Sequence, residues 1–313
     1  MRQLTEHLLK PADRVEVTVL VDNYIDIFVP PATPVDRRLP FDAGRHLLAE
    51  HGLSCLVRVF AGKKEHAVLL DTGFSRECMA WNARQLGVDL TGIEAVALSH
   101  GHFDHTGGLS SVFCGAARQV PLVLHPDAFL QRRMNGPKGT ADLPRLDAVA
   151  LKKAGADLLE RSGPSTLAAG HLLVTGEVER KTSFEKGMPG MERSVDGRWV
   201  PDPIRDDQAL VINVKDKGLV VLSGCAHAGI INTVEYAKKL TGSGHVHAVL
   251  GGFHLTGPAF AKVIQPTIEG MKKIDPDYVV PMHCTGWNAI NRFSLEIPGR
   301  CILNTVGTTY VFG

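Results

Sequence analysis

The sequence predicts an α/β fold in which two packed sheets carry helices on their outer faces. Short alternating apolar runs separated by tight turns fill the N-terminal half, a pattern typical of antiparallel hairpins. The C-terminal half alternates apolar runs with segments of helical periodicity, which indicates βα units. The 313 residues suit one large domain, and we expect a single unit spanning 1–313.

The N-terminal half contains five expected strands. VEVTVLVDN alternates and is β-branched, and two later runs form a hairpin that turns around Gly62-Lys63-Lys64. The fourth strand leads directly into a histidine-rich run. The five ranges are 15–23, 53–62, 65–73, 93–100 and 120–129, and in the last range a helix or turn follows the strand.

The segment 130–205 differs from its flanks because Gly-Pro and Pro-Gly pairs interrupt it, and such pairs break regular structure. Within it, 146–163 has helical spacing with Gly155 as a weak point. We expect an inserted cap segment that lies over one face of the fold.

Regular patterns return after this segment. QALVINVKDKGLVVLSG predicts a hairpin that turns at Asp216-Lys217-Gly218, and IINTVEYAKKLTG predicts a helix closed by Gly242. The remaining expected elements are a strand at 245–252, a helix at 264–275, a strand at 277–286 and a hairpin at 301–313.

Composition excludes several classes of protein. Lys and Arg number 34 against 33 Asp and Glu, so no overall basic field would gather nucleic acid. No run reaches the roughly 18 apolar residues of a membrane helix, and the start of the chain lacks the apolar core of a signal peptide. We therefore expect a cytoplasmic protein that binds neither nucleic acid nor membrane. The oligomeric state has no signal in the sequence.

The run His100-Gly101-His102-Phe103-Asp104-His105 follows the expected strand 93–100. Alternate residues of an extended segment share a face, so His100, His102 and Asp104 can converge, and a turn brings His105 beside them. Imidazoles with a carboxylate suit Zn²⁺, with Fe or Mn as alternatives. Four donors exceed the needs of one open site, which favours two ions: one on His100 and His102, the other on Asp104 and His105.

Three later histidines, His227, His254 and His283, also follow apolar runs, and each has a glycine within three residues. Each alone could be a core or surface histidine, but three in equivalent places favour metal ligation by at least two. Asp71 ends another run and is expected to hold a ligand histidine or the loop, with turn capping as the alternative. Cys225 is either a thiolate ligand or a small buried residue.

The other histidines and cysteines carry weaker signals. His125, in LVLHPDAF, is a candidate substrate contact, and Cys284 is expected either to pack in the interior or to be a redox-active thiol without a role in the site. The histidines without a predicted role are 7, 46, 51, 66, 171, 245 and 247.

Three motifs together resemble the metallo-β-lactamase superfamily: LLDTG (69–73), SHGHFDHTGG (99–108) and PMHCTG (281–286). Three more are similar to one branch of it, whose members carry names such as 7,8-dihydropterin-6-yl-methyl-4-(β-D-ribofuranosyl)aminobenzene 5′-phosphate synthase. They are DDQAL (206–210), GCAHAGIINT (224–233) and GGFHL (251–255). The resemblance implies a four-layer αββα sandwich with one or two metal ions at one edge of the paired sheets.

The resemblance also implies roles for individual residues. His100 and His102 match ligands of the first metal, and Asp104 and His105 match ligands of the second. Asp71 matches the structural acid of the first motif, and His283 matches the histidine that completes the second site.

Two departures from the superfamily pattern stand out. Asp206-Asp207-Gln208 occupies a place where a histidine is usual, and Cys225 stands where a bridging aspartate is usual. His227 is then the best substitute for the missing third histidine of the first site. His254 matches no general ligand motif and is expected to act as an acid, a base or an anion contact.

These observations predict a metal-dependent hydrolase acting on a small ester, lactone or phosphoester. Metal coordination would bring water to a pKa near ~7. Asp104 would orient that water and accept its proton, and His254 would protonate the leaving group or bind substrate oxygen. The branch name suggests an anionic, phosphorylated pterin- or aminobenzoate-like substrate. Cations of the expected cap could hold its phosphate, although a solvated charged surface is the favoured alternative for them: they are Arg132, Arg133, Arg180 and Lys181.

Three alternatives remain open. An iron-dependent oxidoreductase could use the same scaffold, and a catalytically silent module could bind metal and ligand only. A nuclease is disfavoured, because the charge is near neutral and basic residues are not interleaved with aromatic ones.

Overall fold

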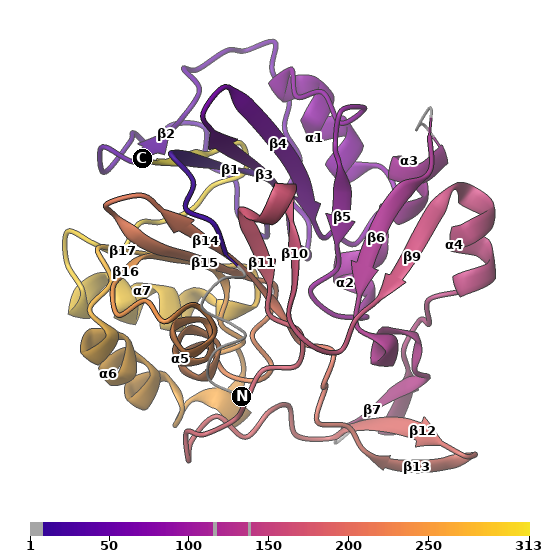
Figure 1. Cartoon of the computed structure of the whole chain (residues 1–313). Helices are drawn as coiled ribbons and strands as arrows, with labels where there is room; N and C mark the ends of the chain where they lie inside the picture. The colour runs from indigo at the N-terminus through magenta and orange to yellow at the C-terminus, as the bar shows by residue number, and fades with distance from the viewer. Residues whose placement is uncertain (1–8, 115–117, 137–138) are drawn as a thin grey trace.

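The computed structural model describes residues 9–114, 118–136 and 139–313. Two sheets lie face to face and helices cover their outer faces, which confirms the predicted αββα sandwich (Figure 1). In the described part of the chain, the helices are all too short or too polar to cross a bilayer.

The first sheet has eight strands in the order β2-β18-β1-β3-β4-β5-β6-β9. β3 and β4 form the expected hairpin, which turns at Gly62 with φ of +59°. From β4 to β9 the strands are parallel, so β4 and β5 end at the same edge. The strands are β1 (Arg14–Val21), β2 (Asp36–Arg37), β3 (Ser54–Ala61), β4 (Lys64–Leu70), β5 (Ala95–Ala97), β6 (Val120–Leu124), β9 (Ala156–Glu160) and β18 (Thr309–Phe312).

The second sheet has six strands in the order β10-β11-β14-β15-β16-β17. The predicted hairpin joins β14 to β15, and β15, β16 and β17 run parallel. Their carboxyl ends therefore meet at one edge, as expected for parallel strands. The strands are β10 (Ser165–Leu167), β11 (Leu172–Val174), β14 (Ala209–Val214), β15 (Gly218–Ser223), β16 (Val246–Gly252) and β17 (Tyr278–Met282).

Apolar side chains fill three layers. Val57, Ile212 and Leu250 belong to the layer between the sheets, where each buried aliphatic side chain contributes about 1.5–3 kcal/mol. A second layer packs α5, α6 and α7 on the six-stranded sheet, and a third packs α1, α3 and α4 on the other sheet. The helices are α1 (Cys78–Leu86), α2 (Phe103–Thr106), α3 (Leu109–Cys114), α4 (Ala148–Ala154), α5 (Ile230–Thr241), α6 (Ile264–Ile274) and α7 (Trp287–Glu296).

The segment 130–205, expected as one cap, is divided among three sheets. Its middle part supplies β9 to the first sheet and β10 and β11 to the second. Only its two ends form a separate four-stranded sheet, which lies beside the sandwich at the lower right of Figure 1. That sheet has the order β13-β12-β7-β8, with β7 (Arg132–Gly136), β8 (Gly139–Asp142), β12 (Met191–Val195) and β13 (Arg198–Pro201).

Two predicted elements are wrong. The helix expected over 146–163 ends at Ala154, because Gly155 adopts a left-handed φ of +112° and the chain continues as β9. The hairpin expected over 301–313 is absent: β18 instead pairs with β1 on one side and β2 on the other. An apolar C-terminal run could pair with any open strand edge, and here that edge belongs to the N-terminal half of the chain.

Candidate metal centre

The loops that leave β4, β5, β15, β16 and β17 meet at one edge of the sandwich. The histidine run follows β5, and its backbone packs tightly against neighbouring chain. A Cβ at Gly101 would lie 2.3 Å from the carbonyl oxygen of Ala128, so only glycine fits there. The Gly101 N–H donates to Asp206 Oδ2 at 2.7 Å. These contacts fix the path that turns alternate side chains toward one point.

One group of donors consists of His100, His102 and His227, whose ligand atoms all lie within 4.8 Å of one another. The Ser99 hydroxyl donates to Asp71 Oδ2 at 2.6 Å, so it accepts from Nδ1 of His100 at 3.0 Å. Nε2 of His100 then carries a lone pair and faces Nε2 of His227 at 3.2 Å. A proton or a cation must lie between two such nitrogens.

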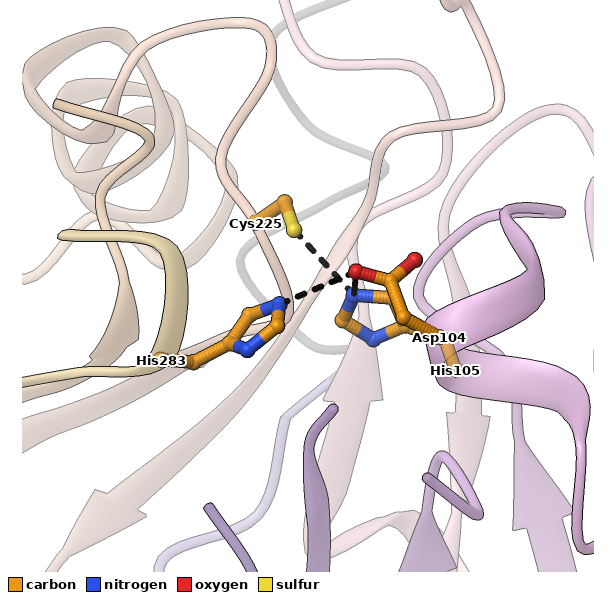
Figure 2. A group of neighbouring side chains, drawn as sticks. All are labelled: Asp104, His105, Cys225 and His283. Carbon is orange, nitrogen blue, oxygen red and sulfur yellow. Dashed lines mark hydrogen bonds and ion pairs between the residues drawn. The ribbon is translucent and has the colours of Figure 1, made fainter. Parts of the chain in front are cut away.

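A second group consists of Asp104, His105, Cys225 and His283, again within 4.8 Å (Figure 2). Nε2 of His105 lies 3.1 Å from Sγ of Cys225. Nε2 of His283 lies 3.4 Å from Oδ2 of Asp104. The four side chains come from α2 and from the loops after β15 and β17, and all are buried.

The outer ring nitrogens of the second group are held by acceptors. Nδ1 of His105 lies 2.6 Å from Oδ2 of Asp71, and Nδ1 of His283 lies 2.9 Å from Oδ1 of Asn23. Each Nδ1 is therefore a donor, so in the neutral form of each ring the lone pair of Nε2 is directed inward. Such outer contacts commonly fix the tautomer of metal-binding histidines.

The imidazoles of the first group are held neutral. Burial lowers the pKa of His102 to about 3, and the nearby Arg132 guanidinium adds to this effect. Burial and the neighbouring histidines place the pKa values of His100 and His227 well below the ordinary range. Neutral imidazole is the form that binds a metal.

The second group is charged. Burial opposes protonation of His105, but the carboxylates of Asp71 and Asp104 raise its pKa to about 9. Burial likewise opposes ionisation of Asp104, yet His105 and His283 hold its pKa below the usual range. Without a metal, the second proton of His105 supplies the positive charge between these carboxylates, and a bound metal ion would replace that proton.

The donors fit a transition-metal ion. Among the described residues, Nε2 of His102 and Nε2 of His283 are buried and lack a hydrogen-bond partner. Buried polar atoms are rarely left unpaired. Imidazole, carboxylate and thiol donors together favour zinc over magnesium or calcium.

Backbone strain gathers at the same edge. Non-glycine residues with positive φ cost about 1–3 kcal/mol each and often mark functional sites. Four of them lie in the loops that carry the donors: Asp71, Ala226, His254 and His283, with φ of 55°, 53°, 45° and 50°.

Cys225 and His254 lie next to both groups. Cys225 also falls within 4.8 Å of the donor atoms of His227 and His254, so its sulfur lies between the two histidine groups. The ring centroids of His254 and His227 are 4.3 Å apart. Cys284 is buried, as expected, and its thiol lies 3.7 Å from the carbonyl oxygen of Cys225.

A cavity of about 200 Å³ opens beside His227 and His254. Its walls are largely apolar, with Phe184, Phe253 and Phe260 as the aromatic members. Lys186 also lines it and is exposed. The cavity places an apolar surface next to the candidate metal centre.

The four basic residues expected to bind phosphate are engaged elsewhere. Arg132 is buried against Asp202 and Asp206. Arg133 pairs with Glu192, and Lys181 pairs with Glu179. Arg180 donates to the backbone carbonyls of His227, Pro203 and Ile204. Burial against two aspartates contradicts a phosphate role for Arg132, and for the other three residues that role stays a prediction.

Sequence reasoning missed His51 and Asn23. Nε2 of His51 lies 3.4 Å from Oδ2 of Asp104, and its side chain is 58% exposed. His51 precedes a strand instead of following one, so the strand-end pattern could not reveal it. Asn23 ends the run VEVTVLVDN and could have been found by that pattern. His125, in contrast, accepts from the N–H of Asp127 and caps a turn.

Comparisons with known proteins point to one superfamily. The family model described as the metallo-beta-lactamase superfamily matches residues 50–144. A Methanocaldococcus jannaschii protein named 7,8-dihydropterin-6-methyl-4-(beta-D-ribofuranosyl)-aminobenzene-5′-phosphate synthase is 34% identical over 255 residues, which is 79% of this chain and 85% of that protein. Uncharacterized protein MJ0448 of the same organism is 32% identical over 252 residues, which cover 80% of this chain and 90% of that protein.

One solved structure is similar over most of both chains. It is Tm1679, described as a metal-dependent hydrolase of the beta-lactamase superfamily, with 25% sequence identity and a TM-score of 0.73. The alignment covers 94% of this chain and 98% of that one.

Proposed function

The chain belongs to the metallo-β-lactamase superfamily, and from that premise we propose that it is a metal-dependent hydrolase of a small ester, lactone or phosphoester. Members of the superfamily are mostly enzymes and usually metal-dependent hydrolases. The observation that carries the proposal is the pair of converging donor groups beside an aromatic cavity.

His100, His102 and His227 would hold one ion. Asp104, His105 and His283 would hold a second, and Cys225 would lie between the two. A divalent ion at such a centre supplies Lewis acidity and lowers the pKa of water.

The chain's own groups supply proton transfer and orientation. The Asp104 carboxylate, which the neighbouring histidines keep ionised, would orient the attacking water by accepting a hydrogen bond from it. His254 faces the cavity next to His227, which is where the leaving group of a bound substrate would lie. It would donate a proton or a hydrogen bond to substrate oxygen.

The cavity supports a substrate with a planar aromatic part. Aromatic walls bind such rings well. Lys186 would face an anionic substituent of that substrate. The M. jannaschii relative is named for a product with aromatic rings and a phosphate. For this chain we propose a substrate of the same class, a phosphorylated pterin- or aminobenzoate-like compound.

The proposal is tested by initial rates of metal-loaded protein on matched aryl and alkyl esters, a lactone, a phosphomonoester and a phosphodiester. We expect turnover that disappears with a chelator and in His102→Ala, with a higher kcat/KM for aryl substrates. The matched control is His46→Ala, which changes an exposed histidine.

Two results would contradict hydrolysis. Oxygen uptake by iron-loaded protein without ester or phosphoester cleavage would indicate an oxidoreductase. Full metal content without turnover of the panel would indicate a binding module.

A further inference from the structure

Three side chains outside the candidate centre lie together at the opposite end of the second sheet: His245, His247 and Asp277. His245 precedes β16, His247 lies near its start, and Asp277 immediately precedes the parallel strand β17. The candidate centre lies at the other ends of these strands, roughly 20 Å away for a strand of this length. The two clusters are therefore separate in space.

Residues 245 and 247 have the same spacing as His100 and His102. Side chains two apart in an extended segment share a face, so both imidazoles approach Asp277 from β16. Nε2 of His245 lies 3.1 Å from Asp277 Oδ2, and Nδ1 of His247 lies 2.6 Å from the same oxygen. All three donor atoms fall within 4.8 Å.

Packing orients the pair before any ion binds. His247 is buried, and its ring meets the edges of Tyr278 and Phe312 at centroid distances of 5.5 and 5.4 Å. Gly218 leaves room for His245, because a Cβ there would lie 2.7 Å from Cδ2 of the ring. A held imidazole loses little side-chain freedom when it becomes a ligand.

We propose that His245, His247 and Asp277 bind a divalent transition-metal ion such as Zn²⁺ and thereby join the starts of β16 and β17. Two imidazole nitrogens and one carboxylate form a donor set that prefers zinc or its neighbours to magnesium and calcium. The half-exposed position of His245 and Asp277, 55% and 45% by side chain, leaves solvent access for water to complete the coordination.

Binding requires only a small rearrangement. Ligand atoms of a tetrahedral zinc site with bonds of about 2.0–2.1 Å are about 3.3 Å apart. The present nitrogen–oxygen distances of 3.1 and 2.6 Å would open toward that value. Each neutral ring keeps one proton, which moves to the nitrogen that faces away from the ion.

The alternative is a hydrogen-bonded cluster that binds no metal. Equilibrium dialysis of the full chain against Zn²⁺, followed by metal analysis, separates the two. The variants are His245→Ala and Asp277→Asn, whose side chains are half-exposed, so that their replacement leaves no large buried cavity. His46→Ala, another exposed histidine, is the control.

We expect wild type and His46→Ala to bind one equivalent more than His245→Ala and Asp277→Asn. In wild type, Zn²⁺ should raise the melting temperature further than in those two variants. Equal zinc content in all four proteins would overturn the proposal, whether or not the protein proves to be a hydrolase. The proposal is also overturned if His245→Ala and Asp277→Asn both keep the additional equivalent of zinc.

Discussion

Oδ2 of Asp71 lies 2.6 Å from Nδ1 of His105 and also accepts a hydrogen bond from the hydroxyl of Ser99. The oxygen of that hydroxyl accepts a hydrogen bond from Nδ1 of His100. A single buried carboxylate thus sets the tautomer of one histidine in each donor group. Asp71 directly follows β4 and has a positive φ of 55°, and its carboxylate contacts Ser99 and His105. The two donor groups are coupled through this residue.

Asp71→Asn should weaken metal binding at both groups. Oδ1 of Asp71 accepts from the N–H of Ser99 at 2.7 Å, and Oδ2 accepts from the Ser99 hydroxyl and from His105. An amide has only one accepting oxygen, so either the backbone at the start of the histidine run or the contacts that orient His100 and His105 lose their acceptor. Loss of such an outer contact typically lowers metal affinity by about 10–100-fold. Competition with a chelating dye measures the effect, and Asp89→Asn, on an exposed turn, is the control. Unchanged affinity in Asp71→Asn would contradict the coupling.

Gly101→Ala should reduce both stability and metal content. The added Cβ would lie 2.3 Å from the Ala128 carbonyl oxygen, so the backbone of the histidine run must move. Overpacking of this kind costs about 1–3 kcal/mol in the free energy of unfolding. Gly92→Ala meets no atom within 4 Å and should change stability by less than about 0.5 kcal/mol. Urea unfolding compares the two, and equal stabilities would refute the close approach at Gly101.

Arg132→Met should destabilise the protein strongly. It leaves the buried carboxylates of Asp202 and Asp206 without their cation, and such losses cost about 3–5 kcal/mol. Arg133→Met, which removes a more exposed pair with Glu192, should cost about 1 kcal/mol. Because Asp206 holds the N–H of Gly101, the first variant should also lose metal. A similar loss of stability in both variants would show that the buried network contributes no more than the surface pair.

Asp207→Asn should stabilise the metal-free protein increasingly as pH rises. Burial raises the pKa of Asp207 from 3.8 to about 6, so the folded state disfavours the ionised carboxylate. Below pH 3.8 both states are protonated and the variant gains nothing. Between these pH values the free energy of unfolding of the wild type falls by about 1.4 kcal/mol per pH unit, or about 3 kcal/mol in all. The amide of Asp207→Asn does not ionise, so the variant keeps that free energy. Unfolding curves from pH 4 to 8 measure this, and a difference independent of pH would contradict it.

Polar residues that follow apolar runs predicted much of the sheet edge that carries the two donor groups. Parallel strands bring their carboxyl ends together at one edge, however many residues separate the strands in sequence. This pattern placed His227 and His283 in loops that the structure brings beside His100 and His105. It could not locate His51, which reaches Asp104 from the start of a strand. Nor could it predict that Arg132 would pair with residues 70 and 74 positions away, since ion pairs between distant segments leave no periodic signal.

The division of 130–205 shows the same limit. Gly155 interrupts a helical pattern, and whether a glycine ends a helix or is tolerated within it depends on what the following residues can pair with. Here the next five residues extend the first sheet beside β6. That edge is formed by chain more than thirty residues earlier, beyond the reach of local periodicity.

Metal stoichiometry tests the central claim most directly. Wild type, His227→Ala, His283→Ala and the control His46→Ala would be loaded with Zn²⁺, passed through a desalting column and analysed for bound metal. At the candidate centre, two ions should remain in wild type and control, and His227→Ala and His283→Ala should each retain one. If His227→Ala retains as much metal as wild type, His227 does not complete the first donor group and the proposed centre is wrong.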